Sequence, residues 1–211
     1  MNDLDLQLVR EFFELNLFRV MPFWQRSDRD PHFFVENALA PSAAIPDFEL
    51  DAEGLASISR GAVSVRAWHA DRFYASVIEA NPAVTAFAQR QSHGAARALF
   101  GAADYKHILV LSELPVSPAP RAAALQTLAR SEVSHVIEFS TVLEGLVRRV
   151  GESGTYASSA SLQLIQLFKR YRFFQQQQLE LGFPMEPPHA AIQVDGVSQV
   201  ETEVDPFEAI E

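Results

Sequence analysis

Two apolar segments of strand length, separated by one helical segment, constrain the fold of this chain more than any other feature. KHILVLSEL (residues 106–114) is a near-continuous apolar run, and VSHVIEFS (residues 133–140) is a second segment with strand character. Such runs are typical of strands that are covered on both faces. PRAAALQTLARSE (residues 120–132) lies between them and has a helical pattern. The three segments therefore predict a right-handed crossover unit with parallel strands, and so an α/β domain.

The residues before this unit predict a helix, a hairpin and a third strand. In residues 3–16, apolar side chains recur with the spacing of an amphipathic helix. LFRVMPFWQ (17–25) and HFFVENA (32–38) have the pattern of strands, and the turn RSDRD (26–30) between them predicts a hairpin. AVSVRAWH (62–69) alternates like a further strand. The expected sheet is therefore mixed, with about five strands flanked by helices.

Three more helices and an acidic tail complete the expected organisation. Asn81 and Pro82 form an N-cap and first-position pair, and they predict a helix that runs to about Phe100. Two extra C-terminal helices are expected over residues 141–152 and 159–181. We therefore expect a single α/β domain over residues 1–181, followed by a proline-containing acidic tail over residues 182–211.

Composition excludes several classes of site. The chain has 211 residues, of which 48% are hydrophobic and 21% charged, as in ordinary globular domains. It has no cysteine, so a disulfide framework, a thiolate zinc site and a cysteine nucleophile are excluded. The stretch MNDLDLQLVREFFELN lacks the features of a signal peptide, and no uncharged apolar run approaches the roughly 18 residues of a membrane span. We therefore expect a cytoplasmic protein with no membrane partner.

The negative charge of the chain is concentrated in the tail. The formal net charge is −10, and the residues from Gly182 onward contain seven acids and no Lys or Arg. An acidic tail repels phosphate backbones, and the near-neutral remainder lacks the basic excess of most nucleic-acid binders. This pattern disfavours a nucleic-acid partner, although a local basic patch would suffice for one. It favours a protein partner or self-association, with the tail docking on the partner.

The predicted order of elements resembles the core of the restriction-endonuclease-like (PD-(D/E)xK) nuclease superfamily. That core is a helix, a three-stranded antiparallel meander, a helix, a strand, a helix and a strand, and the correspondence covers about residues 3–140. Its catalytic pattern is a glutamate on the first helix, an aspartate at the second strand and an acid-x-lysine on the third strand. Carboxylates there hold Mg²⁺, which activates the attacking water, and the lysine stabilises developing negative charge.

The resemblance places part of this pattern on acidic residues of the chain. Glu11 or Glu14 matches the first-helix glutamate. Asp30 lies at the start of the second strand, where the aspartate is expected, and Asp28 is the fallback. If the site were active, Glu11 and Asp30 would be its metal ligands.

The third-strand positions depart from the family pattern. They fall on Ser64 and Arg66, which share a face of the strand because they are two residues apart. Ser64 has no carboxylate, and Arg66 keeps the positive charge but differs from lysine in reach and geometry. The resemblance therefore implies a nuclease-like scaffold with a degenerate catalytic set.

Each of these residues also has a simple structural interpretation. Glu11 and Glu14 fit the solvated face of a helix, and Asp30 fits a turn before a strand. Ser64 and Arg66 fit the solvent side of a strand. If Arg66 is instead buried, it needs a carboxylate partner, and we expect Asp30 or Glu11 to provide it.

We therefore predict a catalytically inactive nuclease-fold domain that acts as a structural or interaction module without a cofactor. The first alternative is a Mg²⁺-dependent nuclease acting on DNA or RNA, which would use Glu11, Asp30 and a third carboxylate such as Glu49 or Asp51. The second is a small-ligand-binding α/β protein with a pocket at the carboxyl ends of the strands, near Ser112 and Ser140.

Two further patterns are weaker. His69 and Asp71 are two residues apart, which fits a turn better than a metal site because further ligands are missing. LFKRYRFF (residues 167–174) interleaves basic and aromatic residues, a pattern that can bind nucleic acid. Leu164, Phe168 and Tyr171 recur at helical spacing, so we expect them to form a packing stripe with the basic residues on the other side.

Overall fold

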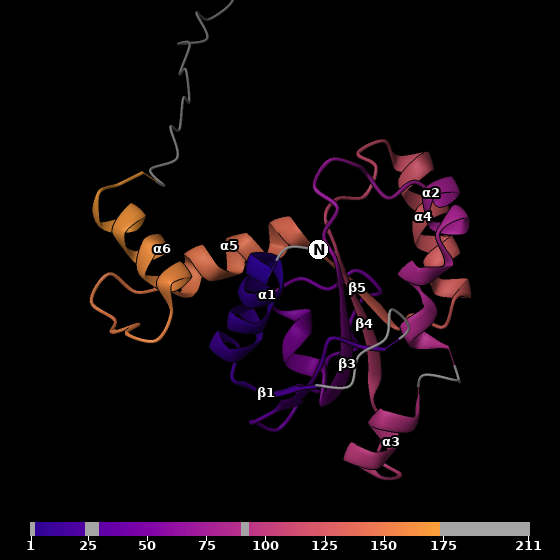
Figure 1. Ribbon diagram of the computed structural model, residues 1–211, viewed down its shortest axis with the longest axis horizontal. Coiled ribbons are helices and arrows are strands. Elements are labelled where there is room, and N and C mark those ends of the chain that lie inside the picture. The colour runs from indigo at the N-terminus through magenta and orange to yellow at the C-terminus, as the bar shows by residue number, and fades with distance from the viewer. Residues whose placement is uncertain (1–2, 24–29, 90–92, 174–211) are drawn as a thin grey trace, which may run out of the picture. The chain divides into compact units, whose positions relative to one another are not determined.

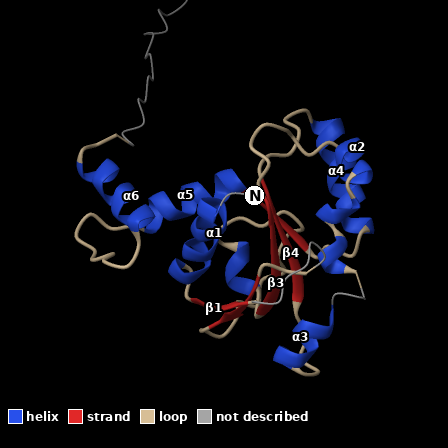
Figure 2. Ribbon diagram, in the orientation of Figure 1, coloured by secondary structure: helices blue, strands red, loops and turns tan. Residues whose placement is uncertain are grey.

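A five-stranded mixed sheet forms the centre of the computed structural model (Figure 2). The structure describes residues 3–23, 30–89 and 93–173. The strands lie in chain order, so each is hydrogen-bonded to its neighbours in the sequence. β1 (Phe18–Pro22), β2 (Phe33–Asn37) and β3 (Arg60–Arg66) form an antiparallel meander. β4 (Lys106–Leu111) pairs parallel with β3, and β5 (His135–Glu138) pairs parallel with β4. The predicted α/β class, hairpin and parallel unit are confirmed.

Helices cover both faces of the sheet (Figure 1). One face packs against the first helix and the penultimate helix, α1 (Asp3–Leu15) and α5 (Phe139–Arg149). The other face packs against α2 (Ala75–Ala80) and α4 (Pro118–Arg130). Two further helices lie at the periphery, α3 (His93–Phe100) and α6 (Ala160–Arg170), and α6 contacts α5.

Alternation along the strands divides the core between these two faces. On β3, Val63 and Val65 point into the cluster that contains the phenylalanines of α1. Ala62 points the other way and packs with Ala96 of α3. Even-numbered residues of β3 therefore face away from α1, which decides where the side chains of the predicted site can lie.

The predicted helix over residues 81–100 is wrong in its first half. The chain forms two short 3₁₀ turns, η2 (Pro82–Val84) and η3 (Ala86–Ala88), before α3 begins at His93. Three consecutive residues of η3 are buried, which one face of an α-helix cannot provide, and Gln89 is extended at φ −73° and ψ 150°. Residues 90–92 lie outside the described part of the chain.

Element ends also differ from the predictions. β5 stops at Glu138, and residues 139 and 140 belong to α5 rather than to the strand. β3 begins two residues earlier than expected and ends at Arg66. One short 3₁₀ helix, η1 (Gly54–Ser57), lies in the connection between β2 and β3.

The stripe predicted on the last helix faces outward. Leu164, Phe168 and Tyr171 are exposed by 50%, 36% and 69%, whereas Leu162 and Ile165 are buried against the core. The predicted packing stripe is therefore wrong. The helix predicted over residues 159–181 also ends early, because α6 stops at Arg170 and residues 171–173 form a turn in which Arg172 is left-handed. Residues 174–211, which include the rest of that predicted helix and the acidic tail, lie outside the described residues.

Candidate functional site

Ser64 and Arg66 lie on the face of β3 that points away from α1. The neighbouring valines, Val63 and Val65, point toward α1 and pack with it. Ser64 is 0% exposed, and Arg66 at the end of the strand is half-buried. The expectation that both residues face solvent is therefore wrong for Ser64.

His32, directly before β2, closes over this part of β3. Its backbone N–H donates to the carbonyl of Val63 at 2.7 Å, and its Nδ1 accepts from the backbone N–H of Val65 at 3.0 Å. Ser64 Oγ lies 3.4 Å from the same nitrogen. Because the Val65 N–H occupies Nδ1, a neutral ring carries its proton on Nε2. This geometry gives Ser64 no free base and does not support it as a nucleophile. Sequence reasoning missed His32, which has no local signal beyond its place before a strand.

Arg66 connects the end of β3 to the segment that follows α2. Its Nη2 donates to the carbonyl of Ala83, in η2, at 3.2 Å. This bond holds a cation at the carboxyl end of β3. The pairing of Arg66 with Asp30 stays a prediction, whereas pairing with Glu11 is opposed by the sheet, because Glu11 lies on the other face.

Asp30 is placed near the same end of the sheet as Arg66. It is half-buried in a bend two residues before His32. Phe33 is opposite Val63 in the antiparallel pair, so the chain that precedes β2 runs alongside the end of β3. The structure thus brings Asp30, Ser64 and Arg66 to one region, as the resemblance implies. The fallback residue, Asp28, lies outside the described residues.

Glu11 belongs to a different site, on the opposite face of the sheet. Its side chain is only 6% exposed, so the expectation of a solvated residue is wrong for it. Its Oε1 accepts from Ser159 Oγ at 2.5 Å and from Gln7 Nε2 at 2.9 Å, and its Oε2 accepts from Ser161 Oγ at 2.5 Å. Ser159 is also the N-cap of α6, accepting from the backbone N–H of Leu162 at 3.0 Å. The carboxylate therefore anchors the start of α6 to α1.

Glu11 lines a polar cleft of about 560 Å³ between α1 and the segment before α6. Glu14 also lines this cleft, remains half-exposed and lies 4.0 Å from Arg10. Of the two glutamates expected on the first helix, Glu14 fits the solvated interpretation, and neither lies on the face of Ser64.

The alternative carboxylates are at the far edge of the sheet. Leu50 and Phe48 exchange backbone hydrogen bonds with Val136 of β5, so Glu49 lies beside the last strand. Asp51 Oδ1 accepts from the backbone N–H of Gly54 at 2.6 Å and begins the η1 turn. Neither residue is near the β2–β3 pair that carries Asp30.

A salt-bridged cluster marks the carboxyl end of β5. Arg121 of α4 donates to both Glu49 and Glu138. Desolvation on burial lowers the pKa of Arg121, but the hydrogen bonds and charges of the two carboxylates outweigh it and raise that pKa overall. Sequence reasoning missed this cluster of Arg121, Glu49 and Glu138, because its members are far apart in the sequence.

Ser112 is buried, and its hydroxyl donates to the backbone carbonyls of Trp68 and Asp71, which is a structural role.

His69 is paired with Asp5 rather than with Asp71. Its Nε2 lies 3.1 Å from the Oδ1 of Asp5, which is 5% exposed in the first turn of α1. The imidazole packs edge-on against Phe139, with ring centroids 4.9 Å apart. A carboxylate that orients an imidazole is one part of an acid–base site. The contact also fixes the loop after β3 to α1.

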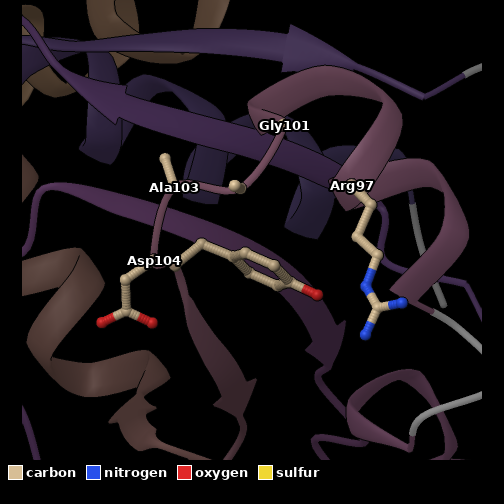
Figure 3. A pocket seen from close by; sticks show the side chains of 6 residues that line it. Arg97, Gly101, Ala103 and Asp104 are labelled. Atoms are coloured by element: carbon tan, nitrogen blue, oxygen red, sulfur yellow. The ribbon is translucent and has the colours of Figure 1, made fainter.

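A shallow hollow of about 520 Å³ lies at the opposite end of the parallel strands, beside α3 (Figure 3). Arg97 and Asp104 lie on opposite sides of it, and Tyr105 also lines it. The pKa of the Tyr105 hydroxyl is raised overall, chiefly because the side chain is partly buried. The charge of Arg97 lowers this pKa, and the charge of Asp104 raises it further. No residue of the predicted site lines this hollow.

Within residues 3–23, 30–89 and 93–173, no three His, Asp or Glu side chains are grouped so that they could hold a metal ion. None of the helices in these ranges has the length and apolar character needed to span a bilayer.

Comparison of the chain with protein-family models, with curated proteins and with solved structures finds no match in any of the three.

Proposed function

We propose that this chain is a restriction-endonuclease-like domain that lacks nuclease activity and serves as a structural or interaction module. The observation that carries the proposal is the environment of Ser64. It occupies the position where the family pattern has an acid, it is fully buried, and it lies against His32 rather than in an open cleft.

The second support is that the candidate residues Glu11 and Ser64 lie on opposite faces of the sheet. In the family pattern, the first-helix glutamate and the strand residues converge on one metal. Here the sheet lies between Glu11 and Ser64, and both oxygens of Glu11 accept hydrogen bonds from residues of α1 and α6. Among the described residues, Asp30 is then the one matched carboxylate on the side of Ser64, so the first-helix glutamate and the third-strand acid of the family pattern are both missing from that side.

Spacing within the sheet argues against the alternative of an active Mg²⁺-dependent nuclease. From β2 to the segment that carries Glu49 there are four strand steps, which correspond to about 19 Å at ~4.8 Å per step. Ligands of one Mg²⁺ ion lie about 2 Å from it. Neither Glu49 nor the adjacent Asp51 therefore completes a site with Asp30.

A protein partner, or a second copy of the chain, is favoured over nucleic acid as the binding partner. The net charge of −10 opposes binding to a phosphate backbone.

Nuclease assays test the proposed loss of activity. The full chain is incubated with end-labelled single- and double-stranded DNA and RNA in the presence of Mg²⁺ or Mn²⁺, and no cleavage above a mock purification is expected. An identically purified Asp30→Ala variant is the matched control. Metal-dependent cleavage by the wild-type chain that is lost in Asp30→Ala would refute the proposal. Cleavage that the mock purification also shows comes from a contaminant, whereas cleavage shared by both proteins and absent from the mock purification would refute the proposal as well.

A further inference from the structure

α6 carries an apolar stripe on the side that faces away from the rest of the described chain. Its inward residues, Leu162 and Ile165, are buried in the core cluster. Large apolar side chains recur at helical spacing on the outward side and remain between 36% and 74% exposed. They are Leu164, Leu167, Phe168, Tyr171 and Phe173. Contiguous exposed apolar surface of this kind marks interaction sites on folded domains.

The end of this stripe is fixed by a Schellman motif. Arg172 adopts a left-handed conformation with φ of 60°. Its backbone N–H donates to the carbonyl of Lys169 at 2.9 Å, and the backbone N–H of Phe173 donates to the carbonyl of Phe168 at 2.8 Å. The rings of Phe168 and Phe173 pack 5.6 Å apart, centroid to centroid. The turn therefore places the Phe173 ring beside Phe168, at the end of the stripe.

Basic residues flank the stripe. Lys169 Nζ donates to the carbonyls of Val147 and Val150, at 2.9 and 2.6 Å, and so holds the end of α6 against the end of α5. Two exposed arginines, Arg170 and Arg172, form an arginine-rich corner at the aromatic end of the stripe, and within the described part of the chain neither is in an ion pair. Arg148 of α5 instead lines a separate hollow together with Asp51, Glu53 and Glu144.

We propose that the outward face of α6 docks an acidic amphipathic segment of a partner protein, an inference that rests on the proposed role as an interaction module. Such a segment would lay its own apolar residues, spaced i, i+3, i+4 and i+7, against the stripe, and would place carboxylates opposite the arginines. α6 has 11 residues and is about 16 Å long at ~1.5 Å per residue, which suits a short segment.

Two other occupants fit this face less well. A second copy would bring the same arginine-rich corner, and one helix face is smaller than the roughly 800 Å² per partner of a standard interface. A single-stranded nucleic acid would find arginines and aromatic rings, but Leu164 and Leu167 at the centre of the stripe offer no stacking surface.

A peptide titration tests the proposal with the full chain. The probe is a synthetic fluorescent helical peptide of about 16 residues, with leucine at the i, i+3, i+4 and i+7 positions and glutamate elsewhere. Its matched control has lysine in place of every glutamate. We expect fluorescence anisotropy to show saturable binding of the glutamate peptide, weakened severalfold by 0.5 M salt, and binding of the lysine peptide at least tenfold weaker.

Surface variants locate the binding site. Leu167→Gln is expected to weaken binding at least tenfold, whereas Leu99→Gln, at a residue of equal type and similar exposure on α3, leaves it unchanged. Arg170→Glu, in the last turn of α6, is expected to weaken binding and reduce its salt dependence, with Arg130→Glu in the last turn of α4 as its control. All four positions are exposed, so the variants are expected to fold.

The outcomes are distinct. Binding lost in Leu167→Gln but kept in Leu99→Gln supports the proposal. Equal binding of both peptides, no binding of either, or equal loss in both leucine variants overturns it. Sedimentation that shows a dimer abolished by Leu167→Gln assigns the face to a second copy, and binding of single-stranded RNA or anionic vesicles in place of the glutamate peptide assigns it to those surfaces; either result also overturns it. Nuclease activity lost in Asp30→Ala would refute the proposed inactivity and leave the peptide result standing.

Discussion

Replacement of Glu11 distinguishes a structural carboxylate from a catalytic one. In Glu11→Ala, Ser159, Ser161 and Gln7 all lose the acceptor that they share. Gln7 lines the polar cleft and keeps Ser161 Oγ as an acceptor at 3.0 Å. Ser159 is 8% exposed, and its hydroxyl exchanges a charged acceptor for its contact with Ser161 Oγ at 3.1 Å. The cost of the substitution should therefore come mainly from Ser159.

The magnitude follows from that hydroxyl. A hydrogen bond to a charged group contributes about 1.5–3 kcal/mol, and a neutral contact such as that of Ser159 with Ser161 replaces about 0.5–1.5 kcal/mol of it. We therefore expect Glu11→Ala to lower the free energy of unfolding by about 1–2 kcal/mol, and Glu11→Gln by less than about 1 kcal/mol, because an amide oxygen still accepts. Glu14→Ala, one turn away and half-exposed, should cost less than about 0.5 kcal/mol.

Urea denaturation of the three variants at pH 7, followed by circular dichroism, measures these differences. The reasoning is refuted if Glu11→Ala is no more destabilising than Glu14→Ala. A stable Glu11→Ala chain that has lost a metal-dependent activity would instead make Glu11 a catalytic residue.

Two further predictions concern packing and pH. A Cβ added at Gly145 of α5 would lie 2.5 Å from a ring carbon of Phe12, so Gly145→Ala should destabilise the chain by about 1–3 kcal/mol in thermal unfolding, and adding Phe12→Leu should recover part of that loss. An unchanged midpoint in Gly145→Ala would contradict the close contact of α1 with α5. The pKa of His135 is lowered from its ordinary 6.5, chiefly because the side chain is buried. Its hydrogen bond to the carbonyl of Asp47 raises this pKa and the charge of Lys106 lowers it, but the net direction is downward. The unfolded chain then binds the proton more readily, so the contribution of neutral His135 to stability is present above pH 6.5 and is lost as pH falls below it. The drop in melting temperature between pH 7 and pH 5 should be smaller in His135→Asn, and an equal drop would show that other groups titrate.

The parts of the fold that were predictable are those that local patterns specify. The parallel unit follows from two apolar runs around a helix, and the hairpin follows from two strands around a short turn. The segment after Pro82 was not predictable in this way. Its residues are buried on several sides by elements remote in sequence, and this burial favours 3₁₀ turns over a continuous helix.

For the candidate site, the sequence predicted only which residues share a face of the same strand. Alternation placed Ser64 and Arg66 on one face of β3, but which face meets α1 depends on contacts that no local pattern records. Likewise, the helical spacing of α1 did not reveal that Glu11 is buried, because its partner Ser159 is 148 residues away. α6 has apolar residues on two sides, and periodicity alone could not tell which side packs inward.

Glu11 links the two proposals made for this chain. In the family that the order of elements resembles, a first-helix glutamate serves the metal site, whereas here the carboxylate holds the N-cap of α6. An acid that anchors α6 on one face of the sheet cannot also serve Ser64 and Arg66 on the other. The same contact positions the helix whose outer face we propose as a docking surface. Glu11→Ala, which removes the acceptor, should therefore weaken binding of the acidic peptide, whereas Glu11→Gln, which keeps an acceptor for Ser159, should leave it nearly unchanged.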